Sequence, residues 1–276
     1  MARFYRSPAQ KTVALLTDFG FKDSYVGVMK AVILSRAPSA NVVDLCHNIM
    51  PQDVVEAAFV LASSYSYFPS GTIFTCVVDP GVGTSRRVLC LTSEKYTFLS
   101  PDNGLLSIMS SELPSKTIYA ATNEALFLKP VSGTFHGRDI FAPLAGHLAA
   151  GEEPAKLGPV TTRIAGMNLP RPIKTAEGVL KGQVVYADQF GNIITNISES
   201  TVTANLTGDL SKVSVTVGRR TVNGIERTYS DVPEGGLLAL FGSSGFLEIS
   251  VNMGNAQQTL ASQRGDEVVL AKARVG

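Results

Sequence analysis

Apolar residues in the first part of the chain follow two periods, one typical of strands and one typical of helices. Short apolar runs at residues 12–19, 41–47 and 72–79 predict strands. The last run, TIFTCVVD, is apolar on both faces, as are the strands of covered parallel sheets. Helical spacing follows the first two runs, over residues 24–36 and from Pro51 to about residue 69. Alternating strands and helices predict an α/β domain with a largely parallel central sheet.

The rest of this region adds a predicted hairpin and two more predicted helices. Residues 87–93 and 96–100 have the apolar pattern of paired strands. Residues 105–113 predict a short helix, and residues 138–150 predict a longer one that ends at Gly151.

The pattern changes near residue 170, where residues 168–178 contain two prolines and no apolar period. We therefore predict an α/β N-terminal domain over residues 1–170, a linker over 171–179 and an all-β C-terminal domain over 180–276. Short strand-like segments in the last region indicate a small barrel or sandwich, and Asn223-Gly224 is expected to form a hairpin turn. These segments are KGQVVYAD, KVSVTVG, GLLALF, GFLEISVN and DEVVLAKA.

Composition and charge exclude several kinds of partner. The chain has 24 Lys+Arg against 23 Asp+Glu and no basic run with interleaved aromatic residues, which predicts neither nucleic-acid nor membrane binding. Its apolar runs are too short for a membrane span, and residues 13–16 are too short for the core of a signal peptide. Cys46, Cys76 and Cys90 form no CxxC pair, which favours reduced thiols in a cytoplasmic protein.

Three polar clusters follow the predicted strands, where open α/β sheets bind ligands. They are residues 17–20, Cys46-His47 and residues 79–86. In the third cluster, Asp79 and Arg86 bracket a tight Pro-Gly loop and could form an ion pair, either in a functional site or as a structural clamp. The loop lacks both GK[ST] and GxGxxG, which argues against phosphate binding.

The other polar candidates in this region also have two interpretations each. His136 precedes a predicted helix and could hold a water or cap the helix. Asp18 could bind two neighbouring ribose hydroxyls or cap the following helix. His47 beside Cys46 suggests a metal, but three histidines without ligand spacing predict no metal site. His147 lies on an apolar helical stripe and is interpreted as structural.

Two segments of the C-terminal region combine polar and aromatic residues. In YADQFGNIITNIS, an amide beside an aromatic ring could bind a purine edge, or the segment could be a β-bulge around Gly191. In FGSSGFLEIS, the backbone N–H groups of a Gly/Ser turn could hold a carboxylate, or the turn could be a plain hairpin.

Together these segments resemble the S-adenosyl-L-methionine hydroxide adenosyltransferases, relatives of the bacterial fluorinase and chlorinase. The resemblance covers nearly the whole chain and includes its division into two domains. Seven motifs match in order: LTDFG, VDLCHNIMPQDV, DPGVGTSRR, SPDNGLL, TFHGRDIFAP, DQFGNIITNI and FGSSGFLEISVN.

The resemblance implies hydrolysis of S-adenosyl-L-methionine to adenosine and L-methionine, with neither cofactor nor metal. It also implies a homotrimer whose active sites lie between the N-terminal domain of one subunit and the C-terminal domain of the next. By match to the motifs, the residues that activate the water would be Asp79, Arg86 and His136.

The same match implies a set of substrate-binding residues. Asp18 would bind the ribose hydroxyls, and Asn192 would bind adenine with Phe190 packed nearby. Asp188 and Ser243 would hold the amino-acid end of the methionine. Phe19 and Asn252 complete this set.

Departures from the halogenating relatives favour water as the nucleophile. Those relatives carry tyrosine at the positions of Asp79 and His136, and fluorinase has a halide-contacting serine at Gly137. A carboxylate at position 79 would repel a halide. Ser244 stands in place of an arginine and Gln52 in place of a tryptophan, which changes the contacts expected to the methionine carboxylate and the adenosine.

Two alternatives from other classes of protein remain open at this point. One is a non-catalytic adenosine or S-adenosyl-L-methionine binding protein, and the other is a halide-dependent transferase. An unrelated α/β hydrolase is not supported, because the chain has no G-x-S-x-G motif.

Overall fold

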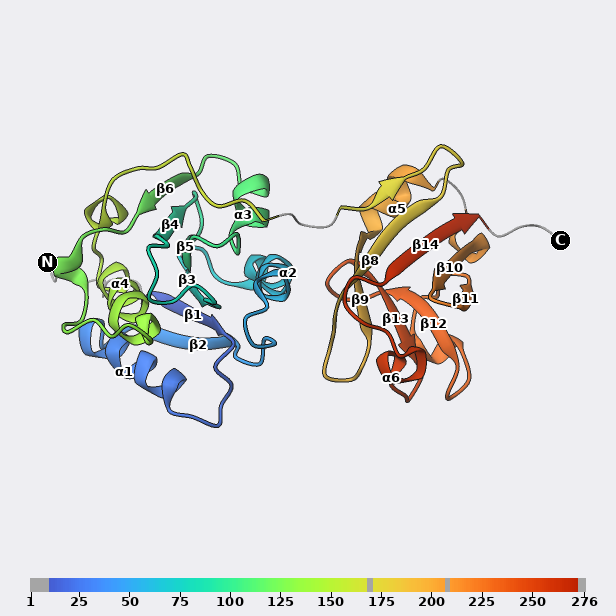
Figure 1. Cartoon of the computed structure of the whole chain (residues 1–276), viewed down its shortest axis with the longest axis horizontal. Helices are drawn as coiled ribbons and strands as arrows, with labels where there is room; N and C mark the ends of the chain where they lie inside the picture. The colour runs from blue at the N-terminus through green and yellow to red at the C-terminus, as the bar shows by residue number, and fades with distance from the viewer. Residues whose placement is uncertain (1–9, 168–170, 207–208, 273–276) are drawn as a thin grey trace, which may run out of the picture. The chain divides into compact units, whose positions relative to one another are not determined.

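The structure, a computed structural model, describes residues 10–167, 171–206 and 209–272 of the chain. It contains two compact units, Met1–Met167 and Asn168–Gly276 (Figure 1). The predicted linker over residues 171–179 falls within the second unit and includes the short strand β7 (Ile173–Lys174), which pairs with β8. Within the described residues, no helix has the length and apolarity needed to cross a bilayer.

The first unit is built on a six-stranded sheet, as the alternating pattern predicts. The strand order is β2-β1-β3-β5-β4-β6, in which β2, β1, β3 and β5 run parallel and β4 pairs antiparallel with both of its neighbours. The predicted α/β class is therefore confirmed, as is the hairpin of β4 and β5. The bounds are β1 (Thr12–Thr17), β2 (Asn41–Cys46), β3 (Ile73–Val77), β4 (Val88–Thr92), β5 (Thr97–Pro101) and β6 (Thr117–Ala120).

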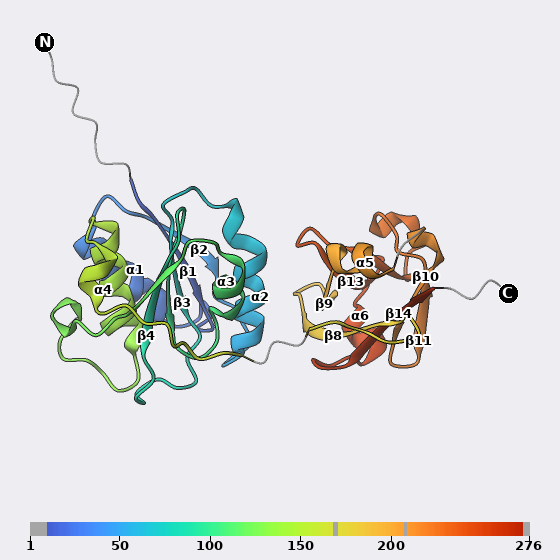
Figure 2. The same ribbon diagram turned by 90° about the horizontal axis from the view of Figure 1, so that it is seen from above.

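Helices cover both faces of this sheet (Figure 2). Successive side chains of a strand point to opposite faces. Val13 and Leu15 of β1 therefore pack in one core with α1 (Tyr25–Arg36) and α4 (Ala142–Ala149). Ala14 and Leu16 pack in the opposite core with α2 (Val54–Ser64) and α3 (Ser107–Glu112). Because β1 is buried on both faces, the residues that follow it have a rigid support.

Two helices begin differently from the prediction. The helix expected from Pro51 begins at Val54, because Gln52 has a φ of +66° and the Asp53 carboxylate caps the helix by accepting from the Glu56 N–H at 2.8 Å. The helix expected over residues 138–150 begins with a π-helical turn, Gly137–Phe141, and continues as α4. Such turns are frequent at functional sites.

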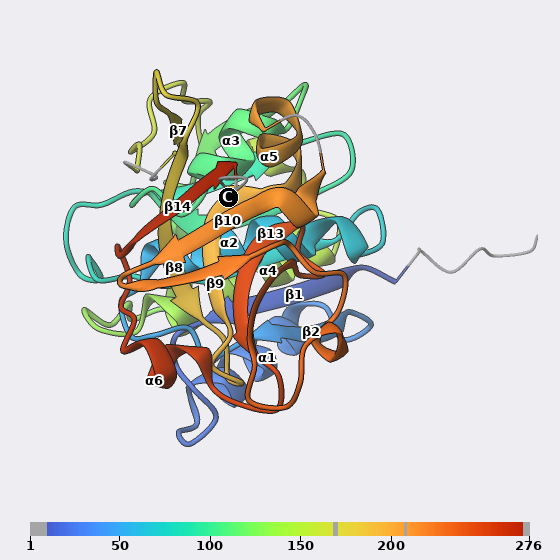
Figure 3. The same ribbon diagram turned by 90° about the vertical axis from the view of Figure 1, so that its right-hand side faces the viewer.

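The second unit is an antiparallel, barrel-like β domain, which confirms the predicted class. The strand order is β11-β10-β14-β8-β9-β13-β12. Two short helices that the pattern did not predict, α5 (Glu199–Asn205) and α6 (Ala256–Leu260), lie at opposite ends of this domain (Figure 3). The strand bounds are β8 (Leu180–Ala187), β9 (Ile193–Ser198), β10 (Val213–Val217), β11 (Arg220–Asn223), β12 (Leu237–Phe241), β13 (Phe246–Val251) and β14 (Glu267–Lys272).

The prediction of a hairpin turn at Asn223-Gly224 is wrong. Val217 pairs with Arg220, so the chain turns at residues 218–219, where Gly218 has a φ of +56°. Asn223 is still within β11, opposite Ser214. A glycine with positive φ was available at both places, and the strand register placed the turn at the earlier one.

Candidate active site

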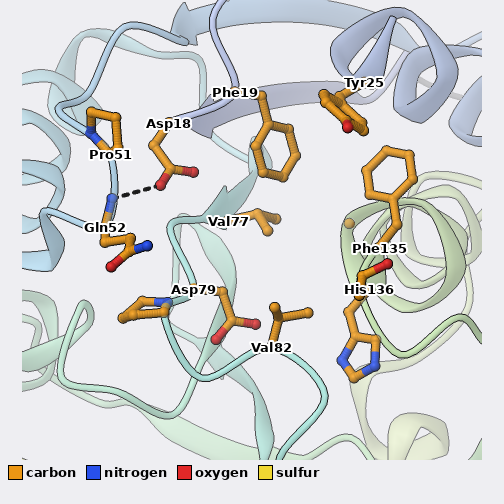
Figure 4. A pocket seen from close by; sticks show the side chains of 13 residues that line it. Asp18, Phe19, Tyr25, Pro51, Gln52, Val77, Asp79, Val82, Phe135 and His136 are labelled. Atoms are coloured by element: carbon orange, nitrogen blue, oxygen red, sulfur yellow. Dashed lines mark hydrogen bonds between the residues drawn. The ribbon is translucent and has the colours of Figure 1, made fainter. Parts of the chain in front are cut away.

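A cavity of about 370 Å³ opens at the carboxyl ends of β1 and β3 (Figure 4). Two of the three polar clusters expected at strand ends, residues 17–20 and 79–86, contribute side chains to it. Cys46 and His47 do not line the cavity, although Pro51 and Gln52 of the same segment do. The lining residues are Asp18, Phe19, Tyr25, Pro51, Gln52, Val77, Asp79, Pro80, Val82, Thr134, Phe135, His136 and Gly137.

Asp79 and Arg86 form the ion pair that the loop sequence suggested. One carboxylate oxygen of Asp79, Oδ2, accepts from Arg86 Nε at 2.8 Å and from Arg86 Nη2 at 2.5 Å. The two side chains are only 5% and 10% exposed, so water screens the pair weakly. Gly83, with a φ of +78°, lets the loop lie against the Gly133 carbonyl, which a Cβ atom would approach to 2.4 Å. The loop is therefore closed by the ion pair at its ends and packed against Gly133 at its middle.

His136 joins this pair through the same guanidinium. Its Nδ1 lies 2.6 Å from Arg86 Nη2. A guanidinium can only donate, so Nδ1 accepts and the imidazole carries its proton on Nε2. Burial lowers the pKa of His136 below its ordinary value, and the Arg86 charge lowers it further, against opposing effects of Asp79 and Asp139. The structure thus brings Asp79, Arg86 and His136 together, with Arg86 in the middle.

The second carboxylate oxygen of Asp79, Oδ1, is buried and has no hydrogen-bond partner among the described residues. A buried acceptor without a partner costs about 1–3 kcal/mol. Asp79 lines the cavity (Figure 4), and Oδ1 is the carboxylate oxygen that Arg86 does not contact. A water molecule or a ligand hydroxyl would satisfy it.

Asp18 lies across the cavity from the Asp79 loop (Figure 4). Its Oδ2 accepts from the Gln52 backbone N–H at 2.8 Å. The cap position of the following helix α1 is occupied by Ser24, so Asp18 does not cap that helix. The helix-cap alternative for Asp18 is thereby removed, and its half-buried carboxylate lines the cavity while one oxygen holds the Gln52 N–H.

One wall of the cavity consists of three aromatic rings. Phe19 lies 5.7 Å from Tyr25 and 6.0 Å from Phe135 between ring centroids, and Tyr25 lies 5.0 Å from Phe135. Sequence reasoning named Phe19 but missed Tyr25 and Phe135. Phe135 stands beside His136 in the motif TFHGRDIFAP, which was the available signal. Tyr25 is the first residue of α1, and nothing in the hydrophobic pattern marks it.

In the second unit, Asp188 organises the loop between β8 and β9. Its Oδ1 accepts from the backbone N–H groups of Phe190 and Asn192, each at 2.9 Å, and its Oδ2 accepts from Asn192 Nδ2 at 3.0 Å. The Asn192 side chain is therefore fixed in orientation, and the residue is 9% exposed. Phe190 is 67% exposed. Three of the predicted substrate-binding residues thus share one ordered loop.

The two remaining predicted residues follow the strands β12 and β13. Ser243 is exposed in the turn that joins them. Asn252 follows β13, and its Nδ2 donates to the Val232 carbonyl at 2.8 Å. This bond gives Asn252 a structural role in its own domain.

No group of three or more His, Cys, Asp or Glu side chains in the described part of the chain is arranged to hold a metal ion. Both ring nitrogens of His47 are within hydrogen-bond distance of protein oxygens, 2.8 Å from Thr17 Oγ1 and 2.9 Å from Asp44 Oδ1.

The fold and the site have counterparts in one protein family. The chain matches the N-terminal domain of the S-adenosyl-L-methionine hydroxide adenosyltransferases over residues 13–158 and their C-terminal domain over residues 182–269. It therefore belongs to this family.

Particular relatives span nearly the whole chain. It is 39% identical to the (R)-S-adenosyl-L-methionine hydrolase of Thermus thermophilus, over 94% of this chain and 99% of that one. The crystal structure of an uncharacterized conserved protein from Thermotoga maritima is similar with a TM-score of 0.88 and 38% identity, covering 94% of this chain and 100% of that one. The fluorinase of Nocardia brasiliensis is more distant, at 28% identity over 87% of this chain and 90% of its own.

The contact between Arg86 and His136 predicts a measurable shift of the His136 pKa. In the wild type, His136 should titrate below pH 6.5, the ordinary value for histidine. In Arg86→Met the pKa should rise, because the positive charge that opposes protonation is gone while the Asp79 carboxylate remains. NMR of the histidine rings measures both values, and the three histidines can be assigned by single substitutions.

Arg87→Met is the matched control, because Arg87 pairs with Asp102 instead, at 2.6 Å. This variant should leave the His136 pKa unchanged. An equal His136 pKa in the wild type and in Arg86→Met would show that the guanidinium does not act on the imidazole in solution.

Proposed function

We propose that this protein hydrolyses S-adenosyl-L-methionine to adenosine and L-methionine, by attack of an activated water on C5′ of the ribose. The observation that carries the proposal is the hydrogen-bonded cluster of Asp79, Arg86 and His136 at the cavity, with Asp79 Oδ1 lacking a partner among the described residues. Relatives 32–39% identical over most of the chain are named (R)-S-adenosyl-L-methionine hydrolases, which supports the same reaction here.

The reaction makes modest chemical demands on such a site. The C5′ carbon bears a sulfonium, so the leaving group is a neutral thioether and needs no general acid. The water oxygen forms a bond to C5′, the C–S bond breaks, and its electron pair passes to sulfur. The partial negative charge on the attacking oxygen and the positive charge of the sulfonium neutralise each other in this step. A water-poor cavity therefore favours it. Orientation alone contributes up to about 7–11 kcal/mol in favourable cases. None of these steps calls for a cofactor.

The observed hydrogen bonds indicate a separate role for each of the three residues. Asp79 Oδ1 accepts the hydrogen bond of the water and takes its proton. Arg86 orients the carboxylate through Oδ2. His136 Nδ1 is already occupied by Arg86, so we assign His136 to orienting the guanidinium, not to accepting the proton. This refines the role suggested by the motif, which left His136 as acceptor or proton carrier.

Substrate binding is assigned to residues of both domains. Asp18 binds the ribose hydroxyls, and the wall that includes Phe19 packs against the nucleoside. Asn192 binds the adenine edge beside Phe190, since Asp188 fixes the orientation of its amide. Asp188 and Ser243 hold the amino-acid end, and Asn252 supports this region through Val232.

We further propose a homotrimer in which each active site combines the N-terminal domain of one subunit with the C-terminal domain of the next. The cavity with Asp79 is lined by the first unit alone, whereas Asn192 and Ser243 belong to the second. A cytoplasmic location is proposed on the three cysteines, all of which are free.

The first prediction from this function concerns the origin of the new oxygen. Incubation of the protein with S-adenosyl-L-methionine in ¹⁸O-water should place the label in the 5′-hydroxyl of adenosine, as read by mass spectrometry. Bound substrate with no product over hours would indicate a binding protein. Formation of 5′-halo-adenosine on adding chloride or fluoride would indicate a halide-dependent transferase. Either result would refute hydrolysis.

The second prediction concerns Asp79. Asp79→Asn keeps the shape but loses the charge, so kcat should fall at least about 100-fold while the dissociation constant of adenosine stays within a few-fold. Steady-state kinetics and calorimetry measure the two effects. Asp102→Asn is the matched control, because Asp102 is a carboxylate of similar burial, 7% exposed, and pairs with the neighbouring Arg87. If both variants kept the wild-type rate, Asp79 would not be the proton acceptor.

The third prediction tests whether two chains share one site. Asp79→Asn and Asn192→Ala should each be nearly inactive alone. Co-expressed, they should regain activity, because some sites in mixed trimers combine an intact Asp79 from one chain with an intact Asn192 from another. Activity that merely equals the sum of the single variants would place both residues of a site in the same chain.

A further inference from the structure

A line of hydrogen-bonded polar groups connects the turn at residues 17–20, which lines the cavity, to the protein surface. Thr17 and His47 are 0% and 1% exposed. Thr17 Oγ1 lies 2.8 Å from His47 Nδ1, and His47 Nε2 lies 2.9 Å from Asp44 Oδ1. Lys30 Nζ donates to Asp44 Oδ2 at 2.7 Å. Phe21 places its ring edge-on against the imidazole, with centroids 5.0 Å apart. None of the roles assigned so far uses this line.

The direction of each hydrogen bond in this line follows from the charges. Burial alone would raise the pKa of Asp44, but the hydrogen bonds from Lys30 and His47 together lower it, so Asp44 is ionised and only accepts. His47 Nε2 therefore carries a proton. Burial also lowers the pKa of His47, which leaves the ring neutral and Nδ1 an acceptor. The Thr17 hydroxyl consequently donates to Nδ1.

With its proton directed at His47, the Thr17 oxygen is turned toward the chain that follows. It accepts from the Phe19 backbone N–H at 3.2 Å. The His47 carbonyl accepts from the Gly20 N–H at 2.7 Å. The turn is therefore attached to His47 at two points, and Asp18 lies between them. Because Asp18 follows Thr17 directly, the orientation of this turn decides where its carboxylate points.

We propose that His47 is a positioning residue for substrate binding: through Thr17 and its own carbonyl it fixes the turn that presents Asp18 and Phe19 to the nucleoside. This inference rests on the proposed function for the identity of the ligand. It assigns a role to the segment VDLCHN, which contributes no side chain to the cavity itself. Lys30 and Asp44 form the outer end of the line and hold the imidazole in one tautomer.

The test separates the Thr17 hydroxyl from the volume of its side chain. Thr17→Val removes only the hydroxyl, so KM for S-adenosyl-L-methionine should rise about tenfold with kcat within about twofold, because ground-state binding of the ribose is weakened. Thr17→Ser retains the hydroxyl and should restore the wild-type KM. Thr75→Val is the matched control: Thr75 is 0% exposed on the adjacent strand β3, and its hydroxyl has no partner among the described residues.

A second pair of variants covers the case in which Thr17→Val does not fold. The side chain of Asp44 is 32% exposed, so a substitution there disturbs the core packing less than one at the fully buried Thr17. Asp44→Leu removes the acceptor of His47 Nε2–H and should raise KM, whereas Asp44→Asn retains an acceptor oxygen and should not. If Thr17→Val matched Thr75→Val, or if Asp44→Leu matched Asp44→Asn, the positioning role would be refuted.

A measurement without substrate distinguishes this inference from the proposed function. Hydrogen exchange of the Phe19 and Gly20 amides should accelerate in Thr17→Val and Asp44→Leu but not in Thr75→Val. Suppose that the wild-type protein does not hydrolyse S-adenosyl-L-methionine, but exchange is faster in Thr17→Val and Asp44→Leu. The hydrolase proposal would then fail, while the positioning of the turn by His47 would be upheld. Unchanged exchange with normal hydrolysis would overturn the positioning role alone.

Discussion

The Arg86 guanidinium is the interaction on which the candidate site depends. It donates twice to one oxygen of Asp79 and also bonds His136, which comes from a segment 50 residues away in the sequence. Because a guanidinium is planar and always charged, it fixes the carboxylate and the imidazole relative to each other. Together with burial, its charge lowers the pKa of His136, so the imidazole is kept neutral. One side chain therefore defines which group can take a proton.

The parallel sheet makes this arrangement possible. The strands β1 and β3 lie side by side and end at the same edge, so the turn with Asp18 and the loop with Asp79 face one cavity. The supporting groups come from the neighbouring edge strand β2, which contains Asp44, and from His47, which follows it. His47 holds the first turn through the Thr17 hydroxyl and through its own carbonyl, which accepts from the Gly20 N–H.

Much of this arrangement could be predicted from the sequence. Short apolar runs predicted the buried strands, and two of the three polar clusters that follow them line the cavity. The ion pair of Asp79 with Arg86 was one possibility suggested by the short loop between them, and the structure contains it. The tautomer of His136 could not be predicted, because it depends on a contact with a residue distant in the sequence. Tyr25 was missed because its neighbours in the aromatic wall belong to other segments. The turn at Asn223-Gly224 was misplaced because strand register, a non-local property, overrode a local signal.

The partnerless oxygen of Asp79 has a consequence for the end of the catalytic cycle. On the proposed mechanism, the attacking water becomes the 5′-hydroxyl of adenosine and stays where it was activated. Once Asp79 has released the proton that it took from the water, this hydroxyl can donate a hydrogen bond to Oδ1, which is otherwise unsatisfied among the described residues. The contact that prepares the nucleophile therefore also retains the product. The hydrogen bond that places the water accurately therefore slows the release of adenosine. Accumulating adenosine would also slow the reaction, because its 5′-hydroxyl competes with water for Asp79 Oδ1.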